Sequence, residues 1–582
     1  MISRFVQTAL LTALACAAPA FANDVAKPSA DPVLDQPTLH SLGAYWIIKG
    51  DANANATVRV DYRKKGAGDW RQGPSMFRVE KGAHKPKENG SLLKIADDET
   101  LLAGSALLLD PDTAYDLKLT LSDPDGGQKV TRTFETRTLK EPVAPEGRMR
   151  YVIPGDGGGR GTKDDPYKGI NAAEGDAKPG DTFLLAPGVY DGSVRLRRSG
   201  EPGKPIIWRG ADHAAGGKTI LDGQGDSRGV YAIGLHDVWF EDLTLRNAKS
   251  AIVAHDSGRF VVRRCHIEGA DFGIVATKNE KDTVNGWFVT DNVMTGPSRW
   301  PRSEGIEDRR GVQLTGSGHV IAYNRITNFG DAIDTMPSIR CDSIDIHNNE
   351  VAQLTDDGIE TDYSQRNVRV FHNRLTNVFQ GISTQPVYGG PIYIFRNAMY
   401  NVSIEPFKMH NGPSGALFLH NTSVRAGSAH VVMTPKPMSN MVSRNNLFVG
   451  TSDDVGINFS IPATDCDFDY DGFAVKANKV WLNWNRGEKF ATFDEMRAKA
   501  PVWKHAVLVN PDGLFASGVR APQTDTTAVS IDTNDVRLSP QSNAVDAGQP
   551  LPGINDDFTG KGPDLGAYEV GAPLPHYGPR TK

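Results

Sequence analysis

The sequence predicts an all-β protein in which a small β-sandwich domain precedes a right-handed parallel β-helix, a solenoid with one coil per repeat. Nine segments carry an apolar strand, then Asn, Asp or Cys, then an alternating apolar pair, at intervals near 24 residues. A fixed period in this range is typical of solenoids. Period-two strand patterns with Gly or Asn at the turns fill the intervals, and no amphipathic helix fits between them. Right-handedness follows the general preference of parallel crossovers.

The repeating position has a physical explanation. The residues at it are Asp242, Cys265, Asn292, Asn324, Asn349, Asn373, Asn397, Asn421 and Asn446. Coils stack at about 4.8 Å, so each Asn amide could bond the coils above and below it, as in a cross-β amide ladder. Asn also tolerates the left-handed backbone of a tight corner. We therefore expect these residues to form one internal, structural column, with Cys265 packed inside it.

The first residues predict export. Residues 1–22 combine Arg4, an apolar run and the Ala20-Phe21-Ala22 cleavage pattern of a signal peptide, with lipoprotein processing at Cys16 as the alternative. We expect a secreted or periplasmic protein, because no later apolar run has the length of a membrane span. Residues 23–35 are polar and rich in Pro and Ala, as in a linker.

Composition excludes several classes of function. The formal net charge is −6, which argues against a general nucleic-acid binder. Three cysteines remain after the predicted cleavage, far apart and odd in number, so neither a disulfide framework nor a zinc site is expected. We expect a monomer.

Residues 36–140 alternate as strands do and predict the β-sandwich. The run from Leu109 to Leu117, Leu-Asp-Pro-Asp-Thr-Ala-Tyr-Asp-Leu, resembles a signature of fibronectin type III domains, in which the tyrosine, here Tyr115, pins a corner of the sandwich. Such domains are usually spacers or binding modules, and a Pro/Gly-containing linker follows at 140–148.

Residues 151–570 are expected to form the β-helix and to carry the catalytic site. The stretches 179–190 and 198–207 resemble the opening coils of secreted β-helix polysaccharide enzymes, such as alginate and pectate lyases. The stretches 538–548 and 563–569 resemble their C-terminal coils. A capping box at Thr492–Glu495 predicts a short helix to about Lys499.

Aligned coils place ionisable residues in columns on the outer face. Strand alternation points the third and fifth residues of each aligned set outward. The resulting columns are Gln313, Asp334, Glu360, Ser383 and Lys408, and beside them Thr315, Met336, Asp362, Gln385 and His410, with Asp331, Asp356 and Asp357 at the adjoining turn. Two carboxylates one coil apart do not comfortably both stay ionised without a cation or a shared proton.

Four interpretations of this cluster stay open. The acids could hold turns or a structural Ca²⁺. They could support Ca²⁺-assisted β-elimination of a uronate glycan, since Ca²⁺ takes carboxylate oxygens. They could supply an acid/base pair for hydrolysis. The solenoid could also bind a glycan without cleaving it.

The motif Asp356-Asp-Gly-Ile-Glu360 resembles the calcium site of family-9 pectate lyases. The resemblance implies that Asp356, Asp357 and Glu360 hold Ca²⁺ with an acid one coil earlier, Asp331 or Asp334, and that a lysine is the base. Here the last motif residue is Glu, and the candidate base, Lys408, lies two coils further on.

The sequence thus nominates catalytic, metal and substrate residues for a polysaccharide-cleaving enzyme. The interval before Asn324 is 32 residues, and its extra loop carries Arg and Trp side chains suited to carboxylates and sugar rings. The catalytic candidates are Lys408, Glu360, Asp334 and His410, and the substrate candidates are Trp300, Arg309, Arg310, Gln313, Asp362, Gln385 and Tyr388.

Overall fold

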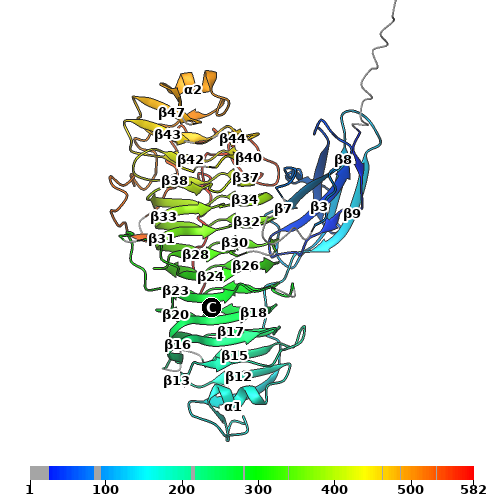
Figure 1. Ribbon diagram of the computed structural model, residues 1–582, viewed down its shortest axis with the longest axis vertical. Helices are drawn as coiled ribbons and strands as arrows, with labels where there is room; N and C mark the ends of the chain where they lie inside the picture. Colours follow the sequence, from blue (N-terminus) through cyan, green and yellow to red (C-terminus); the bar gives the residue numbers. More distant parts are fainter. Residues whose placement is uncertain are drawn as a thin grey trace, which may run out of the picture.

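A computed structural model describes residues 25–581 except 84–92, 212–216, 280–281, 304, 338–339, 435, 460, 462, 486 and 532–533. The expected signal peptide lies outside the described residues. Figure 1 shows a long solenoid with a smaller β-domain against one side of its upper half. Within the described residues, no helix is long and apolar enough to cross a membrane.

The N-terminal domain consists of two antiparallel sheets that share a core. One sheet contains β1 (Lys27–Pro28), β2 (Val33–Leu34), β3 (Leu42–Lys49), β6 (Phe77–Arg78) and β7 (Glu99–Ala106). The other contains β4 (Thr57–Lys64), β5 (Arg71–Gln72), β8 (Ala114–Ser122) and β9 (Val130–Arg137). Trp46, Val60 and Leu119 are among the buried residues between them, so the sandwich prediction is confirmed.

Two details of this domain bear on the expectations from sequence. The hydroxyl of Tyr115 accepts a hydrogen bond from the backbone N–H of Asp110 at 3.0 Å, as the expected corner requires. The segment expected to be a linker, 23–35, contributes two strands to the sandwich. Its β1 and β2 strands both pair with β3, because an open strand edge offers unpaired backbone groups.

The solenoid consists mainly of two long parallel sheets. The first contains β10 (Arg148–Ile153), β11 (Tyr167–Lys168), β12 (Asp181–Leu185), β15 (Ile206–Gly210), β17 (Val238–Glu241), β19 (Val261–Arg263), β22 (Phe288–Thr290), β26 (Val320–Ala322), β30 (Asp345–His347), β32 (Val368–Phe371), β34 (Tyr388–Phe395), β37 (Ser414–Leu419), β40 (Met438–Ser439), β41 (Val442–Arg444), β44 (Ala463–Thr464) and β45 (Asp467–Phe468). The second contains β13 (Gly188–Asp191), β14 (Val194–Arg195), β16 (Thr219–Ile233), β18 (Thr244–His255), β20 (His266–Glu268), β21 (Phe272–Ala276), β23 (Val293–Thr295), β24 (Arg310–Leu314), β27 (Arg325–Thr327), β28 (Asp331–Asp334), β31 (Glu350–Glu360), β33 (Arg374–Ser383), β35 (Ala398–Val402), β36 (Phe407–Lys408), β38 (Thr422–Val424), β42 (Leu447–Val449), β46 (Gly472–Ala474) and β49 (Val507–Leu508).

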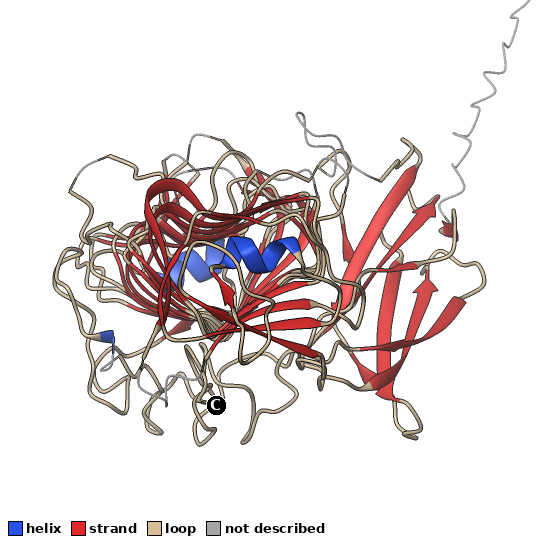
Figure 2. Cartoon of the chain, turned by 90° about the horizontal axis from the view of Figure 1, so that it is seen from below, coloured by secondary structure: helices blue, strands red, loops and turns tan. Residues whose placement is uncertain are grey.

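Smaller elements complete the coils and cover the two ends. Short sheets are formed by β25 (Gly316–Ser317) with β29 (Cys341–Asp342), and by β39 (His430–Val432), β43 (Val455–Phe459), β47 (Val480–Trp484) and β48 (Glu488–Phe490). Helix α1 (Ile170–Gly175) covers one end of the solenoid, as Figure 2 shows when viewed from below, and packs Ile170 and Ala173 into the core. Helix α2 (Phe493–Lys499) begins at the predicted cap, where Thr492 accepts from the N–H of Glu495.

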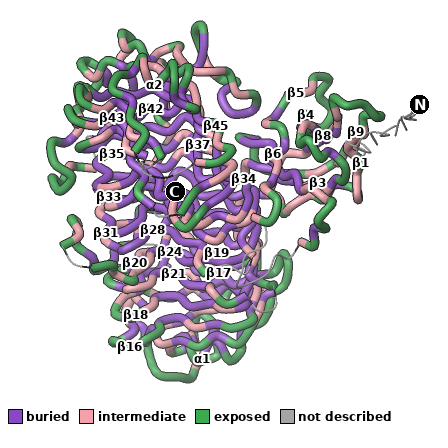
Figure 3. Tube along the Cα trace, turned by 45° about the horizontal axis from the view of Figure 1, so that its top comes forward, coloured by how far each residue is buried: buried purple, intermediate pink, exposed green. Residues whose placement is uncertain are grey.

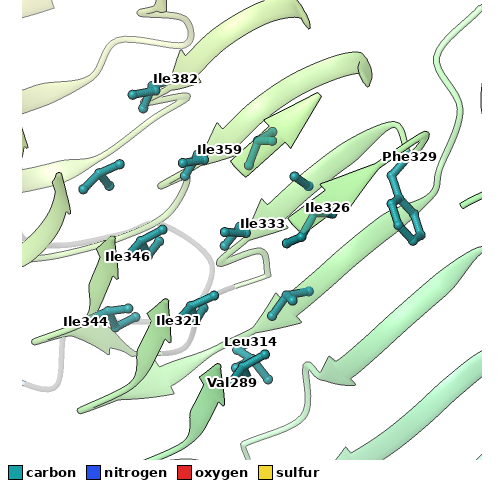
Figure 4. Close-up of a cluster of buried hydrophobic side chains, with 14 of the residues drawn as sticks. Val289, Leu314, Ile321, Ile326, Phe329, Ile333, Ile344, Ile346, Ile359 and Ile382 are labelled. Atoms are coloured by element: carbon teal, nitrogen blue, oxygen red, sulfur yellow. The ribbon is translucent and has the colours of Figure 1, made fainter. Parts of the chain in front are cut away.

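The interior of the solenoid is filled by aliphatic and aromatic side chains from successive coils. Figure 4 shows Ile333, Ile359 and Ile382 in the interior, each from the next coil. These side chains are 0% exposed. The strand alternation that buries them turns the residues on either side of them outward.

The predicted asparagine column is present inside the corner of the coil. Each amide nitrogen from Asn292 to Asn421 donates to the amide oxygen of the next coil's asparagine at 2.9 or 3.0 Å. The column begins at Cys265, whose backbone N–H donates to Asn292, and ends at Asp471, which accepts from Asn446.

The column corrects the alignment at its first position. Leu243, and not Asp242, occupies the position equivalent to Cys265: the carbonyl of Leu243 accepts from His266, as that of Cys265 does from Val293. Asp242 instead bonds Arg264 at the corner. The left-handed backbone conformation that was expected of the asparagines is adopted instead by the residue before each of them. Tyr323 before Asn324 is an example.

The C-terminal segment also differs from expectation. Residues 509–570 contain no strand among those described, and they pack apolar side chains such as Leu514, Leu538 and Leu565 on outward residues of the second sheet, including Tyr400 and Val449. Among its described residues, this segment forms no further coil. It covers the outside of the existing coils, because those outward positions are apolar.

The sandwich lies against the side of the solenoid near β34 (Figure 3), and buried polar side chains connect the two. Arg369 and Asp345 form an ion pair at 3.0 Å in which both side chains are 0% exposed. Ser105 of β7 accepts from Arg369 and donates to Asn367. Asp35 accepts from Arg366 at 2.8 Å. A buried charge needs its partner, so these contacts hold the sandwich in one position.

Candidate functional site

The predicted outward column exists, with the register that was expected. Gln313 pairs with Asp334, Asp334 with Glu360, Glu360 with Ser383 and Ser383 with Lys408 across β24, β28, β31, β33 and β36. The inward neighbours Val312, Ile333, Ile359, Ile382 and Phe407 are in register as well, and this fixes the direction of the outward side chains.

Three carboxylates of this region converge. Asp331, Asp357 and Glu360 each offer an oxygen, and these oxygens lie within 4.8 Å of one another. The backbone N–H of Asp357 donates to Asp331 at 2.9 Å, which ties the two coils together. Oδ1 of Asp357 and Oε2 of Glu360 are buried without a hydrogen-bond donor among the described residues. The same holds for Oε1 of Gln380, which is in register with Asp357 on the next coil.

One amine lies at the edge of this group. Nζ of Lys408 is 2.6 Å from Oδ2 of Asp357 and 4.0 Å from Oε1 of Glu360. The side chain of Lys408 is only 9% exposed, so it lies largely buried beside these acids.

The remaining three acids of the predicted cluster have partners of their own. Both oxygens of Asp334 accept hydrogen bonds, Oδ2 from Arg310 at 2.6 Å and Gln313 at 2.8 Å, and Oδ1 from the N–H of Met336. Asp356 accepts from Arg302 at 3.2 Å. Asp362 accepts from Ser383 at 2.7 Å and from the N–H of Gln385 at 2.6 Å, while its Oδ2 is buried without a partner in the part of the chain described.

Burial and crowding of like charge disfavour ionisation of these acids. Burial, with repulsion from Asp357, raises the pKa of Asp331 well above its usual range and that of Asp356 to about 6. Burial, with repulsion from Asp331, raises the pKa of Glu360 well above its usual range. Burial raises the pKa of Asp362 to about 8.

The surroundings that disfavour the charged form of the acids favour the charged form of Lys408. Burial would lower the pKa of Lys408, but the surrounding acids, Asp357 foremost, outweigh burial and raise it above its usual range. Six carboxyl groups share this face with the cations of Lys408, Arg310 and Arg302, and the cations offset the charge of those acids that are ionised.

Four other sequence candidates make no hydrogen bond or ion pair with the three converging acids among the described residues. His410 bonds Glu405 at 3.1 Å, and Glu405 also accepts from the N–H of Met433, so this pair joins coils. Arg309 pairs with Asp271 and Glu307. The indole N–H of Trp300 is buried without an acceptor among the described residues. The ring centroid of Tyr388 lies 6.0 Å from that of Tyr363, the residue after Asp362.

The structure adds Arg302, which the sequence placed only in the long loop. Its guanidinium lies 3.5 Å from the ring centroid of Phe379 and donates to the carbonyl of Thr355 as well as to Asp356. The loop residue Glu307 accepts from Thr355. Both contacts fasten the loop to the coil that carries the acids, and no sequence pattern indicates which of the loop's arginines does so.

Comparison with known proteins supports the fold. Residues 219–385 match a family model described as a right-handed β-helix region. No curated protein matches the sequence.

Several solved structures share an overall likeness. Pectate lyase Pel9A is 17% identical, with a TM-score of 0.33, over 73% of this chain and 97% of that chain. XylC in complex with xylose is 11% identical, with a TM-score of 0.41, over 72% and 98%. The catalytic domain of GH87 α-1,3-glucanase in complex with nigerose is 12% identical, with a TM-score of 0.30, over 84% and 98%. At these identities and TM-scores the likeness does not extend to activity.

Proposed function

We propose that this protein cleaves a uronate-containing polysaccharide by β-elimination, with Lys408 as the base and Ca²⁺ held by Asp331, Asp357 and Glu360. The observation that carries the proposal is the position of Lys408, whose Nζ lies 2.6 Å from one of three converging carboxylates and 4.0 Å from another. This chemistry needs a base and a cation site next to each other, and Lys408 and the three carboxylates would supply them.

The donor set fits Ca²⁺. All the converging atoms are carboxylate oxygens, which hard cations prefer, and two buried ones lack a donor among the described residues. The amide oxygen of Gln380 would add a neutral ligand from the next coil. The raised pKa values of Asp331 and Glu360 show that their ionised forms need positive charge nearby. When bound, Ca²⁺ would neutralise these acids, bind the substrate's carboxylate and make the adjacent C5 proton more acidic.

Lys408 would then take the C5 proton. The electron pair of the C5–H bond forms the C4–C5 double bond, the C4–O4 bond breaks, and the leaving oxygen acquires a proton from water. The base must be neutral for this step, and the acids beside Lys408 hold its proton on. Charge neutralisation around Asp357 is therefore a condition for turnover.

The arginines would position the substrate. Arg310 is held by Asp334 and Arg302 by Asp356, and both are partly exposed beside the acids. A guanidinium recognises a carboxylate through paired hydrogen bonds, so these residues suit a polyuronate chain laid along the coils.

Hydrolysis is the second candidate, and one observation favours it. Glu360 has a pKa raised by burial and by Asp331, which is the property of a general acid. Its nearest carboxylates lie within 4.8 Å, close to the separation of about 5 Å found in retaining hydrolases.

A single assay separates the two reactions. The purified protein is incubated with a panel of acidic and neutral polysaccharides, with Ca²⁺ and with EDTA, while ultraviolet absorbance of an unsaturated uronate and reducing ends are recorded. The proposal expects both signals to rise together on an acidic polymer and to stop with EDTA. Reducing ends without absorbance, resistant to EDTA, would establish the hydrolase. Binding of a polymer without cleavage would indicate a glycan-binding protein, and neither binding nor cleavage would contradict the proposal.

A further inference from the structure

A cavity lies where the sandwich meets the solenoid, beside the candidate site. It measures about 280 Å³ and is lined from the sandwich by Val33, Tyr45 and Leu101, and from the solenoid by Gln365, Arg366 and Tyr388, among others. Its size is near the lower end of pockets that hold small ligands. Because both domains line it, it exists only in the assembled chain.

The lining combines ring faces with paired charges. The guanidinium of Arg366 lies 4.6 Å from the ring centroid of Tyr45, and its charge is offset by Asp35 and Asp342 at 2.8 and 3.2 Å. Val33 is 45% exposed, an apolar side chain left open at the rim. Apolar and aromatic surface with a few fixed polar groups is the composition of a site for a sugar ring and its hydroxyls. The balanced charges do not select a carboxylate.

The cavity wall and the acid cluster are joined by short stretches of chain on the same coils. Asp362 accepts from the N–H of Gln385, and the adjacent Tyr363 has its ring 6.0 Å from that of Tyr388 on the cavity wall. Gln365, also on the wall, is three residues from Asp362, a span of at most about 11 Å even for an extended chain. A polymer seated at the acids and running in this direction reaches the cavity.

The wall is held rigidly by the interface. Asp35 accepts from Arg366 and from Asn367 at 2.6 Å, and Arg369 is buried between Ser105 and Asp345. The sandwich therefore faces the solenoid in a fixed position, as a preformed binding site requires.

We propose that this cavity is a distal sugar-binding subsite, in which the sandwich domain binds a unit of the same glycan chain that is cleaved at Lys408. The inference rests on the proposed function. It gives the sandwich a part in substrate binding, where the sequence indicated only a spacer or a separate binding module.

The test measures how binding depends on chain length. Oligosaccharides of increasing length are prepared from the polysaccharide that the wild type cleaves, and their Kd is measured by calorimetry in a Lys408→Ala background, which binds without cleaving. Tyr45→Ala removes a ring from the wall, and Val33→Trp fills the cavity from an exposed position without removing an interface contact. Trp70→Ala is the matched control, since Trp70 stacks with Arg63 and Lys118 on the other sheet of the sandwich.

In the parent and in Trp70→Ala, affinity should increase with chain length. In Tyr45→Ala and Val33→Trp that gain should be lost, with Kd for the longest chains about tenfold higher and Kd for the shortest unchanged. Length dependence that persists in Val33→Trp overturns the subsite even if Tyr45→Ala weakens folding. If the wild type cleaves no glycan of the panel, the proposed function fails and the subsite with it. Cleavage with unchanged length dependence refutes the subsite alone.

Discussion

Lys408 reaches Asp357 across an intervening coil, with Nζ 2.6 Å from Oδ2 although the residues are 51 apart in sequence. Two coils separate their backbones by about 10 Å. On the intervening coil, Ser383 lies in register between Lys408 and Glu360, the neighbour of Asp357 in the cluster, and it is small and turns its hydroxyl toward Asp362. A larger side chain at position 383 would occupy the space through which the Lys408 side chain extends. The small size of Ser383 therefore allows the amine of Lys408 to reach the acid cluster two coils away.

Replacement of Lys408 tests the base. Lys408→Ala should lower kcat by about a hundredfold to ten-thousandfold with little change in KM, because a general base acts in the transition state. Lys408→Arg should be almost as inactive, since a guanidinium stays protonated. Lys476→Ala, which removes an exposed ion pair with Asp512, is the control. Near-normal turnover by Lys408→Ala, with loss of activity in Glu360→Gln, would assign the chemistry to the carboxylates.

Ser383→Leu extends this test without touching an ionisable group. The leucine should separate Lys408 from Asp357 and lower kcat, while Ser383→Ala keeps the space and should retain most of the activity. Steady-state kinetics on the same polysaccharide compares the two variants. Equal activity of both would show that the reach across Ser383 is unimportant.

Metal binding should depend on the converging acids. Chelator-treated wild type should bind Ca²⁺ in calorimetry, and its free energy of unfolding should rise by about 2.7 kcal/mol at a hundredfold excess over Kd. Asp357→Asn should lose most of the affinity and this stabilisation, while remaining folded, because it removes charge from a crowded site. Asp512→Asn, on the surface, should bind as wild type does. Unchanged Ca²⁺ binding by Asp357→Asn would place the cation elsewhere.

The sequence predicted the column through Asp334, Glu360 and Lys408 because two independent periods agree. The inward apolar residue recurs in each coil, and the asparagine of the ladder recurs with it, so a slip in register would break both patterns. At the first position of the ladder only one signal was present, and the alignment was wrong by one residue. Asp242 was chosen because Asp tolerates a tight corner as Asn does, whereas the buried residue at this position is Leu243.

Side-chain reach and loop packing could not be derived in that way. Which arginine of the long loop meets Asp356, and that His410 turns toward Glu405, depend on rotamers and on contacts between coils. The cavity at Tyr45 likewise depends on how two domains dock, for which a repeat pattern carries no information.

The ladder should be an important source of stability. Asn373→Ala leaves the N–H and amide nitrogen of Asn349 without the acceptor that now lies at 3.0 and 2.9 Å. Each buried donor left unpaired costs about 1–3 kcal/mol, so the loss of the acceptor for two donors should lower the free energy of unfolding by about 2–6 kcal/mol. Urea denaturation measures the change, with Asn53→Ala on the sandwich surface as control. A loss below about 1 kcal/mol would show that the column is dispensable.

The end of the ladder predicts a pH dependence. Asp471 accepts from the N–H and amide of Asn446, from Ser443 and from Trp503, and burial raises its pKa to about 6. The folded state therefore holds this proton more tightly than the unfolded chain, whose aspartate titrates near 3.9. By linkage, the contribution of Asp471 to stability is fully present below about pH 4 and is lost as pH rises through about 6.

Asp471→Asn removes this titration. Urea denaturation at both pH values measures the unfolding free energy at pH 4 minus that at pH 7. This quantity should be lower in the variant than in the wild type by on the order of 2–3 kcal/mol. The comparison between pH values cancels the constant loss expected from placing an amide donor against the indole N–H of Trp503. Asp453→Asn, at an exposed position, is the control and should leave the wild-type difference unchanged. The same pH difference in wild type and Asp471→Asn would mean that Asp471 stays ionised throughout, held by its four donors.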